Sequence, residues 1–326
     1  MEQISIIGMF LALVLLSFMV MKGANIFIAA IASTILVSLT GGIGLYEALQ
    51  THYMGGFANF FGSNFLIFMA GAIMGEVYNK TNGAKAIAKM IIEKMGSNAS
   101  LIAVPIAIGV LTYGGIMGFV VVFAVYPIAV EIFRQADIPR RFIPSVIIFG
   151  SCTFSAVGPG NPQASNVILM NSLGTSLMSG ATIGFICAFV NLFVGLAILT
   201  YLVKKAKANG EHFIVRATDK VDDTSAAPNG IVALIPLVVT LVLINVKVNG
   251  ANICPTSFGV FIGAALAYVM MKKYEAEDSN ASTIAATGIK NSITTAANTA
   301  AVVGFGSVVK STVGFPVLCA AMENIP

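Results

Sequence analysis

Long apolar runs without charge alternate along the chain with short clusters of charged residues. Three runs, Gln3–Met21, Ala226–Val246 and Asn291–Val309, each have roughly the length of one membrane-spanning helix, since about 20 helical residues cross the hydrocarbon core of a bilayer. Two further runs, Gly96–Val130 and Phe142–Val203, are too long for one crossing. The pattern predicts several transmembrane helices and two segments with more complex paths.

The composition also indicates a membrane protein. Hydrophobic residues make up 57% of the chain and charged residues 10%, whereas roughly a quarter of a soluble domain is charged. The net charge of +4 comes from Lys and Arg in the loops, as the positive-inside rule expects, and requires no nucleic-acid partner. The cysteines lack metal-ligand or CxxC spacing, so we expect neither a metal nor a disulfide at Cys152, Cys187, Cys254 or Cys319.

The basic residues indicate a topology. Spans at Gln3–Met21, Ile26–Leu39 and Phe60–Gly75 are followed by Asn79–Gly96, whose lysines and apolar residues are typical of an amphipathic helix on a membrane surface. If the basic clusters lie on the cytoplasmic side, the Thr40–Asn59 connection, which has no Lys or Arg, lies outside.

The same rule assigns paths to the two long runs. Residues 96–133 must enter and leave on the cytoplasmic side, which predicts a re-entrant hairpin with Thr112–Gly115 near its tip. Residues 142–203 must cross twice, first as a helix broken at Gly158–Pro162 and then as a continuous helix from about Leu177 to Val203. After a polar linker, the remaining spans are expected at Ile231–Val246, Ser257–Met271 and Asn291–Val309.

A short internal repeat indicates how the two halves are related. Residues 75–83 and 306–314 share the pattern Gly-x-Val-x-x-x-Thr-x-Gly. Each copy ends the third span of its half, and the two spans run in opposite directions, as in the inverted repeats of many secondary transporters. The second half should then repeat the hairpin and the broken helix and end at roughly position 430. We therefore expect about 110 residues of this repeat to be absent after Pro326.

These features predict an all-α membrane protein, namely an inverted-repeat secondary transporter with a re-entrant hairpin, a broken transmembrane helix and an incomplete second repeat. We expect scaffold spans in 1–78 and a cytoplasmic linker in 204–229. The amphipathic helix, the hairpin, the broken helix and the following span should occupy 79–203, and the truncated start of the second repeat 230–326.

The break in the second long run has residues suited to a binding site. Irregular backbone survives in lipid only where protein or a cavity satisfies its polar groups. Gly158 and Gly160 let a ligand approach the backbone, Asn161 is a good N-cap, and Pro162 suits the first position of a new helix. The positive end of that helix would attract a carboxylate without a buried Lys or Arg. An extracellular turn is the alternative, but Ser165–Leu173 is too short and polar to span alone.

The candidate substrate-binding residues fall into three groups. They are Gly158, Pro159, Gly160, Asn161, Gln163, Ser165 and Asn166 at the break, Thr153 and Ser155 on the helix before it, and Tyr113, Gly114 and Gly115 at the hairpin tip, where a simple tight turn is an equal alternative. Glu76, Glu131 and His52 are candidate proton carriers, although solvated helix ends explain them at least as well. The chain has no HExxH or GxSxG motif, so we expect neither an enzyme nor a cofactor.

The stretch 112-TYGG…FVVVFAVYPIAVEIFRQADIPRRFIP-144, followed by 158-GPGNPQASNVI-168, resembles the gluconate permease family, GntP-like gluconate:proton symporters within the ion transporter superfamily. The likeness extends from about Tyr46 to Phe213. Its most specific parts are the run Phe133–Arg141 and the Pro-Gly-x-Pro-Gln-x-x-Asn pattern that begins at Pro159.

The resemblance implies proton-coupled uptake of a small organic anion in the bacterial inner (plasma) membrane, either a sugar acid such as gluconate or a short hydroxy acid such as 3-hydroxybutyrate. It also implies a multi-pass homodimer in which a transport domain moves against a static scaffold. Two alternatives remain open, a sodium-coupled carrier and a non-transporting fragment or partner subunit. By the resemblance, the substrate site would be lined by Pro159, Gly160, Asn161, Pro162, Gln163 and Asn166.

Overall fold

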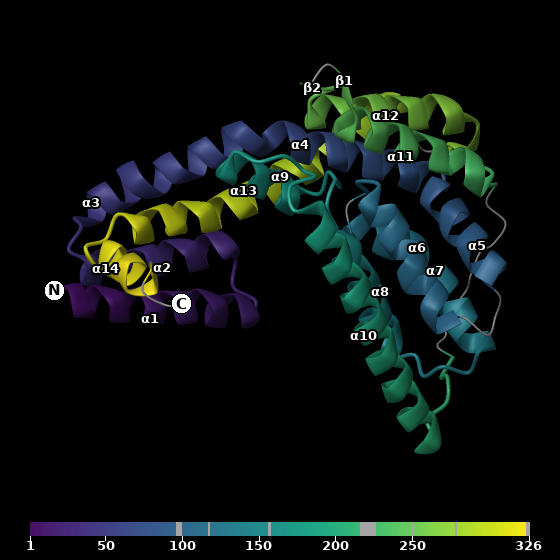
Figure 1. The fold of residues 1–326 in the computed structure, drawn as a ribbon, viewed down its shortest axis with the longest axis horizontal. Coiled ribbons are helices and arrows are strands. Elements are labelled where there is room, and N and C mark those ends of the chain that lie inside the picture. The colour runs from purple at the N-terminus through teal and green to yellow at the C-terminus, as the bar shows by residue number, and fades with distance from the viewer. Residues whose placement is uncertain are drawn as a thin grey trace. The chain divides into compact units, whose positions relative to one another are not determined.

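The computed structural model describes residues 1–95, 100–116, 118–155, 158–215, 226–248, 251–277 and 279–323. Helices form most of this structure, in the order shown in Figure 1. The chain divides into two compact units, one made of Met1–Leu66 with Ser292–Pro326 and the other of Ile67–Asn291.

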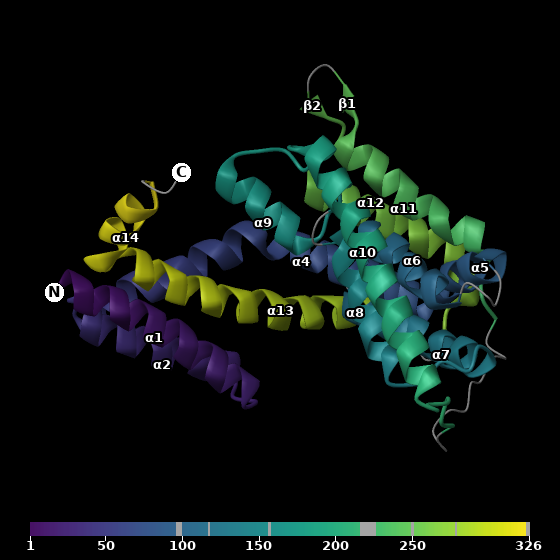
Figure 2. The same cartoon turned by 60° about the horizontal axis from the view of Figure 1, so that its bottom comes forward.

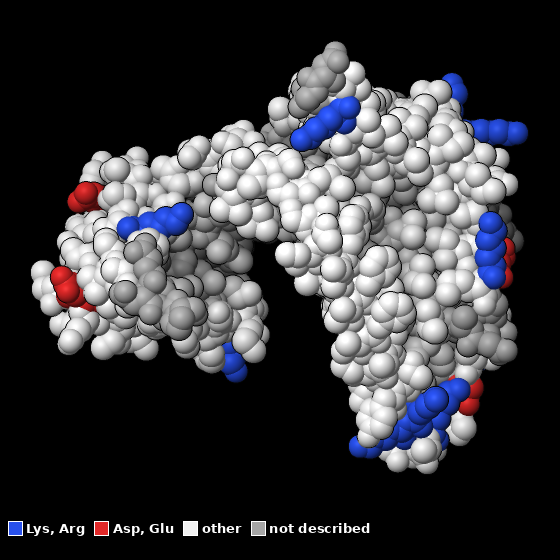
Figure 3. Space-filling model, in the orientation of Figure 1, with Lys and Arg blue, Asp and Glu red and all other residues white. Residues whose placement is uncertain are grey.

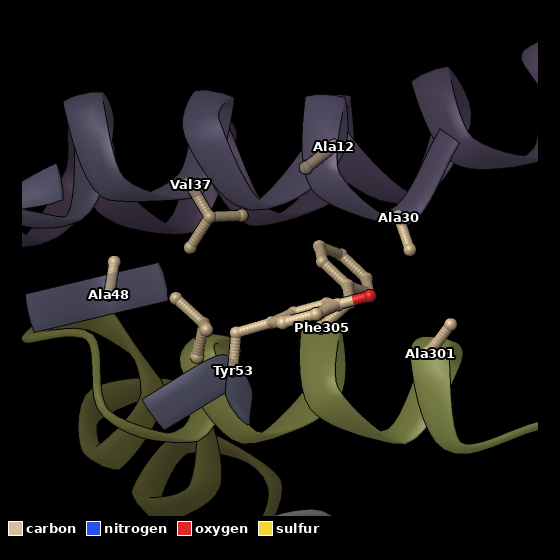
Figure 4. Packing of buried hydrophobic residues seen from close by; sticks show 8 residues of the cluster. Ala12, Ala30, Val37, Ala48, Tyr53, Ala301 and Phe305 are labelled. Carbon is tan, nitrogen blue, oxygen red and sulfur yellow. The ribbon is translucent and has the colours of Figure 1, made fainter. Parts of the chain in front are cut away.

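The first unit packs its helices around small residues. Its core joins Ala12 of α1, Ala30 of α2 and Ala301 of α13 around the ring of Tyr53 (Figure 4). Helices α1 and α2 lie side by side (Figure 2), and small residues let such helices approach closely. Its elements are α1 (Glu2–Met21), α2 (Ile26–Gly41), α3 (Leu45–Glu47), the π-helical turn η1 (Ala48–Tyr53), the first half of α4 (Met54–Lys80), the last part of α13 (Ala281–Lys310) and α14 (Gly314–Glu323).

The second unit contains the predicted hairpin and the predicted broken helix. Helices α6 and α7 form a helical hairpin, and α8 packs against both of them and against α10 (Figure 1). Gly150 of α8 lies so close to α6 that a Cβ there would be 2.7 Å from the Pro105 carbonyl oxygen. Besides the rest of α4 and α13, the unit comprises α5 (Gly83–Met95), α6 (Ser100–Tyr113), α7 (Gly118–Gln135), α8 (Phe142–Ser155), α9 (Ala164–Leu173), α10 (Ala181–Ala208), α11 (Gly230–Asn245), the hairpin of β1 (Lys247–Val248) and β2 (Ala251–Asn252), α12 (Thr256–Met271) and η3 (Lys272–Tyr274).

Most expected spans are helical, but one expected connection is wrong. Residues 40–59 were expected to form an external loop, yet Leu45–Lys80 is one continuous helical run. In the sequence, the polar residues around His52 and the Gly55-Gly56 pair favour a loop. Instead the helix widens into π-turns at Ala48–Tyr53, and Gly56 packs so closely that a Cβ there would lie 2.1 Å from Ser307 Oγ. Gly56 therefore lies on the face of the helix that packs against α13.

Other boundaries differ by smaller amounts. The amphipathic helix begins at Gly83 and not at Asn79, because a turn containing Asn82 at φ 53° separates it from α4. Among the described residues, four helices are long and apolar enough to cross a membrane: Glu2–Met21, Leu45–Lys80, Ala181–Ala208 and Ala281–Lys310. The inverted repeat and the re-entrant path of the hairpin stay predictions.

Ionic contacts fasten the loop between α7 and α8 to the chain after α10. Asp137 accepts a hydrogen bond from the Phe213 N–H at 2.9 Å and contacts His212 Nδ1 at 2.7 Å, while Arg141 pairs with Glu211 at 2.8 Å. The Phe213 N–H, followed by His212, lowers the pKa of the Asp137 carboxyl below its usual value. Asp137 and Arg141 belong to the specific run Phe133–Arg141, so the run has a structural role at the charged end of α10, where basic side chains gather (Figure 3).

Two buried tyrosines allow a matched test of hydrogen bonding. Tyr78 donates to the Ala233 carbonyl at 2.7 Å, whereas the Tyr53 hydroxyl is buried without a partner among the described residues. Loss of an existing hydrogen bond costs about 1 kcal/mol of folding stability. Removal of an unpaired buried hydroxyl instead removes the cost of burying that group away from water. We expect Tyr78→Phe to lower the Tm of the purified protein and Tyr53→Phe to leave it unchanged or raise it. A lower Tm for Tyr53→Phe would contradict this assignment.

Candidate functional site

The break between α8 and α9 is a buried segment of irregular backbone. Helix α8 ends at Ser155 and α9 begins at Ala164, and Gly158, Pro159 and Gly160 are all buried. Gly160 adopts φ 80°, a conformation that glycine reaches without steric cost. Its N–H donates to the Leu177 carbonyl at 2.8 Å, which ties the break to the segment that leads into α10.

The helix after the break begins later than the sequence predicts, which corrects the expected role of Asn161. Asn161 was expected to cap a helix starting at Pro162, but the N-cap of α9 is Gln163. The Asn161 side chain accepts from the Gln163 N–H at 3.0 Å and donates to the Gly158 carbonyl. This pairing with the backbone two residues on is an Asx-turn, which competes with helix initiation at Pro162.

The hairpin tip is hydrogen-bonded directly to the break. The Tyr113 hydroxyl donates to the Pro159 carbonyl at 2.6 Å. Gln163 Nε2 reaches back to the carbonyls of Thr112 at 2.7 Å and Ile116 at 3.0 Å. These bonds bring together Tyr113 and the break residues, which the sequence predicted as parts of one site from positions far apart in the chain.

Both tip glycines are needed for close packing. Gly115 has φ 100°, and a Cβ there would lie 2.8 Å from Pro162 Cγ at the break. A Cβ on Gly114 would lie 2.9 Å from Leu237 Cδ1 of α11. Glycine at these two positions therefore allows the hairpin tip to touch both the break and α11.

Helix α11 supplies a residue that the sequence analysis missed. Asn245, the last residue of α11, donates from Nδ2 to the Gly160 carbonyl at 2.6 Å. The available signal was a polar residue at the end of the apolar run Ala226–Val246. Because helix ends usually carry polar residues, that signal did not point to the break.

The remaining candidate residues lie at the edge of the site or outside it. Asn166 donates to the Gly158 carbonyl at 3.2 Å, whereas Ser165 is exposed. Thr153 is buried, but its hydroxyl donates to the Phe149 carbonyl one turn earlier and accepts from Asn191 of α10. Among the described residues, no hydrogen bond joins Thr153 to the break. The side chain of Ser155 lies outside the described part.

The side chains of the site carry no charge, but the start of helix α9 contributes partial charges from its backbone. Neither long run that forms it contains Asp, Glu, Lys or Arg. The first N–H groups of a helix lack intrahelical partners and carry a partial positive charge. Gln163 forms no side-chain cap bond to α9, since its amide bonds the hairpin tip instead. No group of three or more His, Cys, Asp and Glu residues suited to a metal occurs in the described part of the chain.

The long apolar helices first define the class of the protein. It is a multi-pass helical protein of the bacterial inner membrane. The family follows from comparison with known proteins. The model of the GntP family permeases matches residues 4–314, and the chain belongs to this family of permeases.

Individual relatives match over part of their length. The chain is 36% identical over 205 residues to the uncharacterized transporter YxjC of Bacillus subtilis, which is 62% of the chain and 43% of that protein. An uncharacterized transporter of Haemophilus influenzae is 30% identical over 179 residues, 54% of the chain and 40% of that protein. The high-affinity gluconate transporter of Escherichia coli is 24% identical over 230 residues, 70% of the chain and 50% of that protein. In each match the chain spans half of the relative or less.

Gln163 offers a test of how the hairpin is held. Replacing it with Leu keeps its approximate size and removes both bonds to the tip carbonyls, so the tip should open locally more often. We expect amide hydrogen exchange of residues 110–116 to accelerate about tenfold in Gln163→Leu, measured by mass spectrometry. Ser165→Ala, at an exposed position two residues later, is the control and should not change it. Unaltered exchange in Gln163→Leu would mean that packing alone holds the tip.

Proposed function

We propose that this chain forms the substrate-binding half of a secondary transporter that carries a small hydroxylated monocarboxylate, such as gluconate, inward together with protons. The observation that carries this proposal is the neutral break joined to the hairpin tip by Tyr113 and Gln163. Family membership and the similarity to a gluconate transporter support the substrate class. Within a homodimer, the segment 96–175 would move against a scaffold. That scaffold would include the first and seventh expected spans, Gln3–Met21 and Ser257–Met271.

An organic anion fits the polarity of the break. A carboxylate at the start of α9 would meet N–H groups that no side chain caps, together with the positive end of the helix dipole. Asn166 lies on the first turns of α9 beside the Gly158 carbonyl and can turn its amide toward polar groups of a ligand. Binding of this kind needs no buried Lys or Arg, whose permanent charge is costly inside a bilayer.

The contacts at the break favour protons over sodium as the coupling ion. Sodium would require oxygen ligands, and the break supplies mainly carbonyls. The carbonyls of Gly158, Pro159 and Gly160 each accept a hydrogen bond from an amide or hydroxyl group of the protein. A cation would have to share these oxygens with the protein's own donors. Coupling by a proton requires only a protonatable side chain elsewhere.

Uptake measurements test the proposal directly. Cells expressing the full natural reading frame that contains this chain should accumulate labelled gluconate or 3-hydroxybutyrate. Accumulation should collapse with a protonophore and should not depend on sodium. Sodium-dependent accumulation that survives the protonophore would support the sodium-coupled alternative, and absence of uptake with the protein present in the membrane would remove this substrate class.

Glu76 is the candidate proton carrier that the structure favours. It is 7% exposed, and it is the one acidic or basic side chain among the buried residues of the described chain. Of the other two candidates, Glu131 pairs with Arg134, and His52 bonds Ser311. No described residue gives Glu76 an ion pair or a hydrogen bond, although Lys80, Lys85, Lys272, Glu275 and Lys290 lie on elements that surround this end of α4.

Replacing Glu76 with Gln separates coupling from binding. Glu76→Gln resembles the protonated state, so gluconate exchange between the two sides of the membrane should persist while proton-driven accumulation is lost. The measurement is counterflow compared with pH-gradient-driven uptake in proteoliposomes. Glu131→Gln, which removes an exposed ion pair, should keep both activities. Intact accumulation in Glu76→Gln would assign the proton to another group.

A further inference from the structure

Asn245 holds its amide in one orientation at the end of α11. Its Nδ2 donates both to the Gly160 carbonyl at 2.6 Å and to the Leu241 carbonyl at 3.1 Å. The opposite orientation would turn an oxygen toward two carbonyl oxygens, so these partners fix which atom is nitrogen.

The other atom of this amide has no partner. Asn245 Oδ1 is buried and receives no hydrogen bond from any described residue. Buried acceptors in folded proteins are nearly always satisfied, and an exception at a functional site commonly marks the place of a ligand or a water. Oδ1 is directed to the side of Gly160, since a Cβ built on that glycine would lie 3.1 Å from it.

Gly160 allows Asn245 and Met178 to pack closely against the break. A Cβ at Gly160 would also lie 2.6 Å from Met178 Sδ, so any side chain there would fill the region between Met178 and Asn245. The φ of 80° at Gly160 further disfavours other residues. The same glycine therefore presents its carbonyl to Nδ2 and allows Oδ1 to lie directly beside the backbone of the break.

We infer that Asn245 is a substrate-contacting residue that determines specificity, with Oδ1 accepting a hydrogen bond from a hydroxyl group of the substrate. This inference rests on the proposed function and adds to it the group that recognises the hydroxyl. A carboxylate has no hydrogen to donate and would repel Oδ1, whereas a hydroxyl donates to it. With the carboxylate at the start of α9, Asn245 selects hydroxylated acids over acids without a hydroxyl group.

The test compares two ligands that differ by one hydroxyl. Purified full-length protein should bind 3-hydroxybutyrate more tightly than butyrate, measured by isothermal titration calorimetry. Asn245→Leu has similar volume and should lower the affinity for 3-hydroxybutyrate about tenfold while leaving that for butyrate nearly unchanged. Asn64→Leu is the matched control, because Asn64 is buried and, like Asn245, donates from Nδ2 to a carbonyl four residues earlier, that of Phe60 at 3.0 Å.

The outcomes separate this inference from the proposed function. Equal weakening of both ligands in Asn245→Leu would show that the amide only supports the break, or binds a water, and would overturn the inference while the transporter proposal stands. Failure of the wild-type protein to bind any hydroxy acid would instead contradict the proposed substrate class. If Asn245→Leu does not fold, Asn245→Ala removes the same oxygen from a half-buried position and gives the same comparison.

Discussion

Backbone carbonyls that leave a helix need new hydrogen-bond donors, and the break between α8 and α9 depends on this constraint. Inside a bilayer each unsatisfied group costs several kcal/mol. The donors come from three separate elements: Tyr113 at the end of α6, Asn166 on α9 and Asn245 at the end of α11. The irregular backbone is therefore stable only while the hairpin tip and α11 are in place. Any movement of the hairpin would therefore change the geometry of the break.

Hydrogen bonds act over short distances, so these elements must approach one another closely. Glycine makes that approach possible. Gly115 brings the hairpin tip against Pro162, and Gly160 brings its carbonyl against Asn245. Close packing of small residues also holds the first unit together, where Gly8 of α1 lies against Thr40 of α2. In lipid, where helices gain little from hydrophobic association, contacts of this kind supply much of the packing energy.

Much of the architecture could be predicted from the sequence because its signals are local. Apolar runs predicted the spans, and two glycines and two prolines in an uncharged run predicted the break at 158–162. The errors come from contacts between distant residues. The helical path through Gly55-Gly56 depends on Ser307, and the start of α9 depends on Asn161 bonding to Gln163 and not to a helix end. Asn245 was missed because its partner Gly160 lies 85 residues away in sequence.

The hydrogen bonds divide the polar residues of the break by task. Asn161 uses its oxygen and its nitrogen within the break, and Gln163 uses its nitrogen on two carbonyls of the hairpin. Such side chains have little capacity left for a ligand, so their replacement should act on substrate binding through the shape of the backbone. Asn166 and Asn245 each donate to a carbonyl but keep an acceptor oxygen without a described partner. The motif that begins at Pro159 does not make this distinction, because Gln163 of the first pair and Asn166 of the second both appear in it as amide side chains. The geometry assigns support of the break to the first pair, and our proposal assigns contact with the substrate to the second.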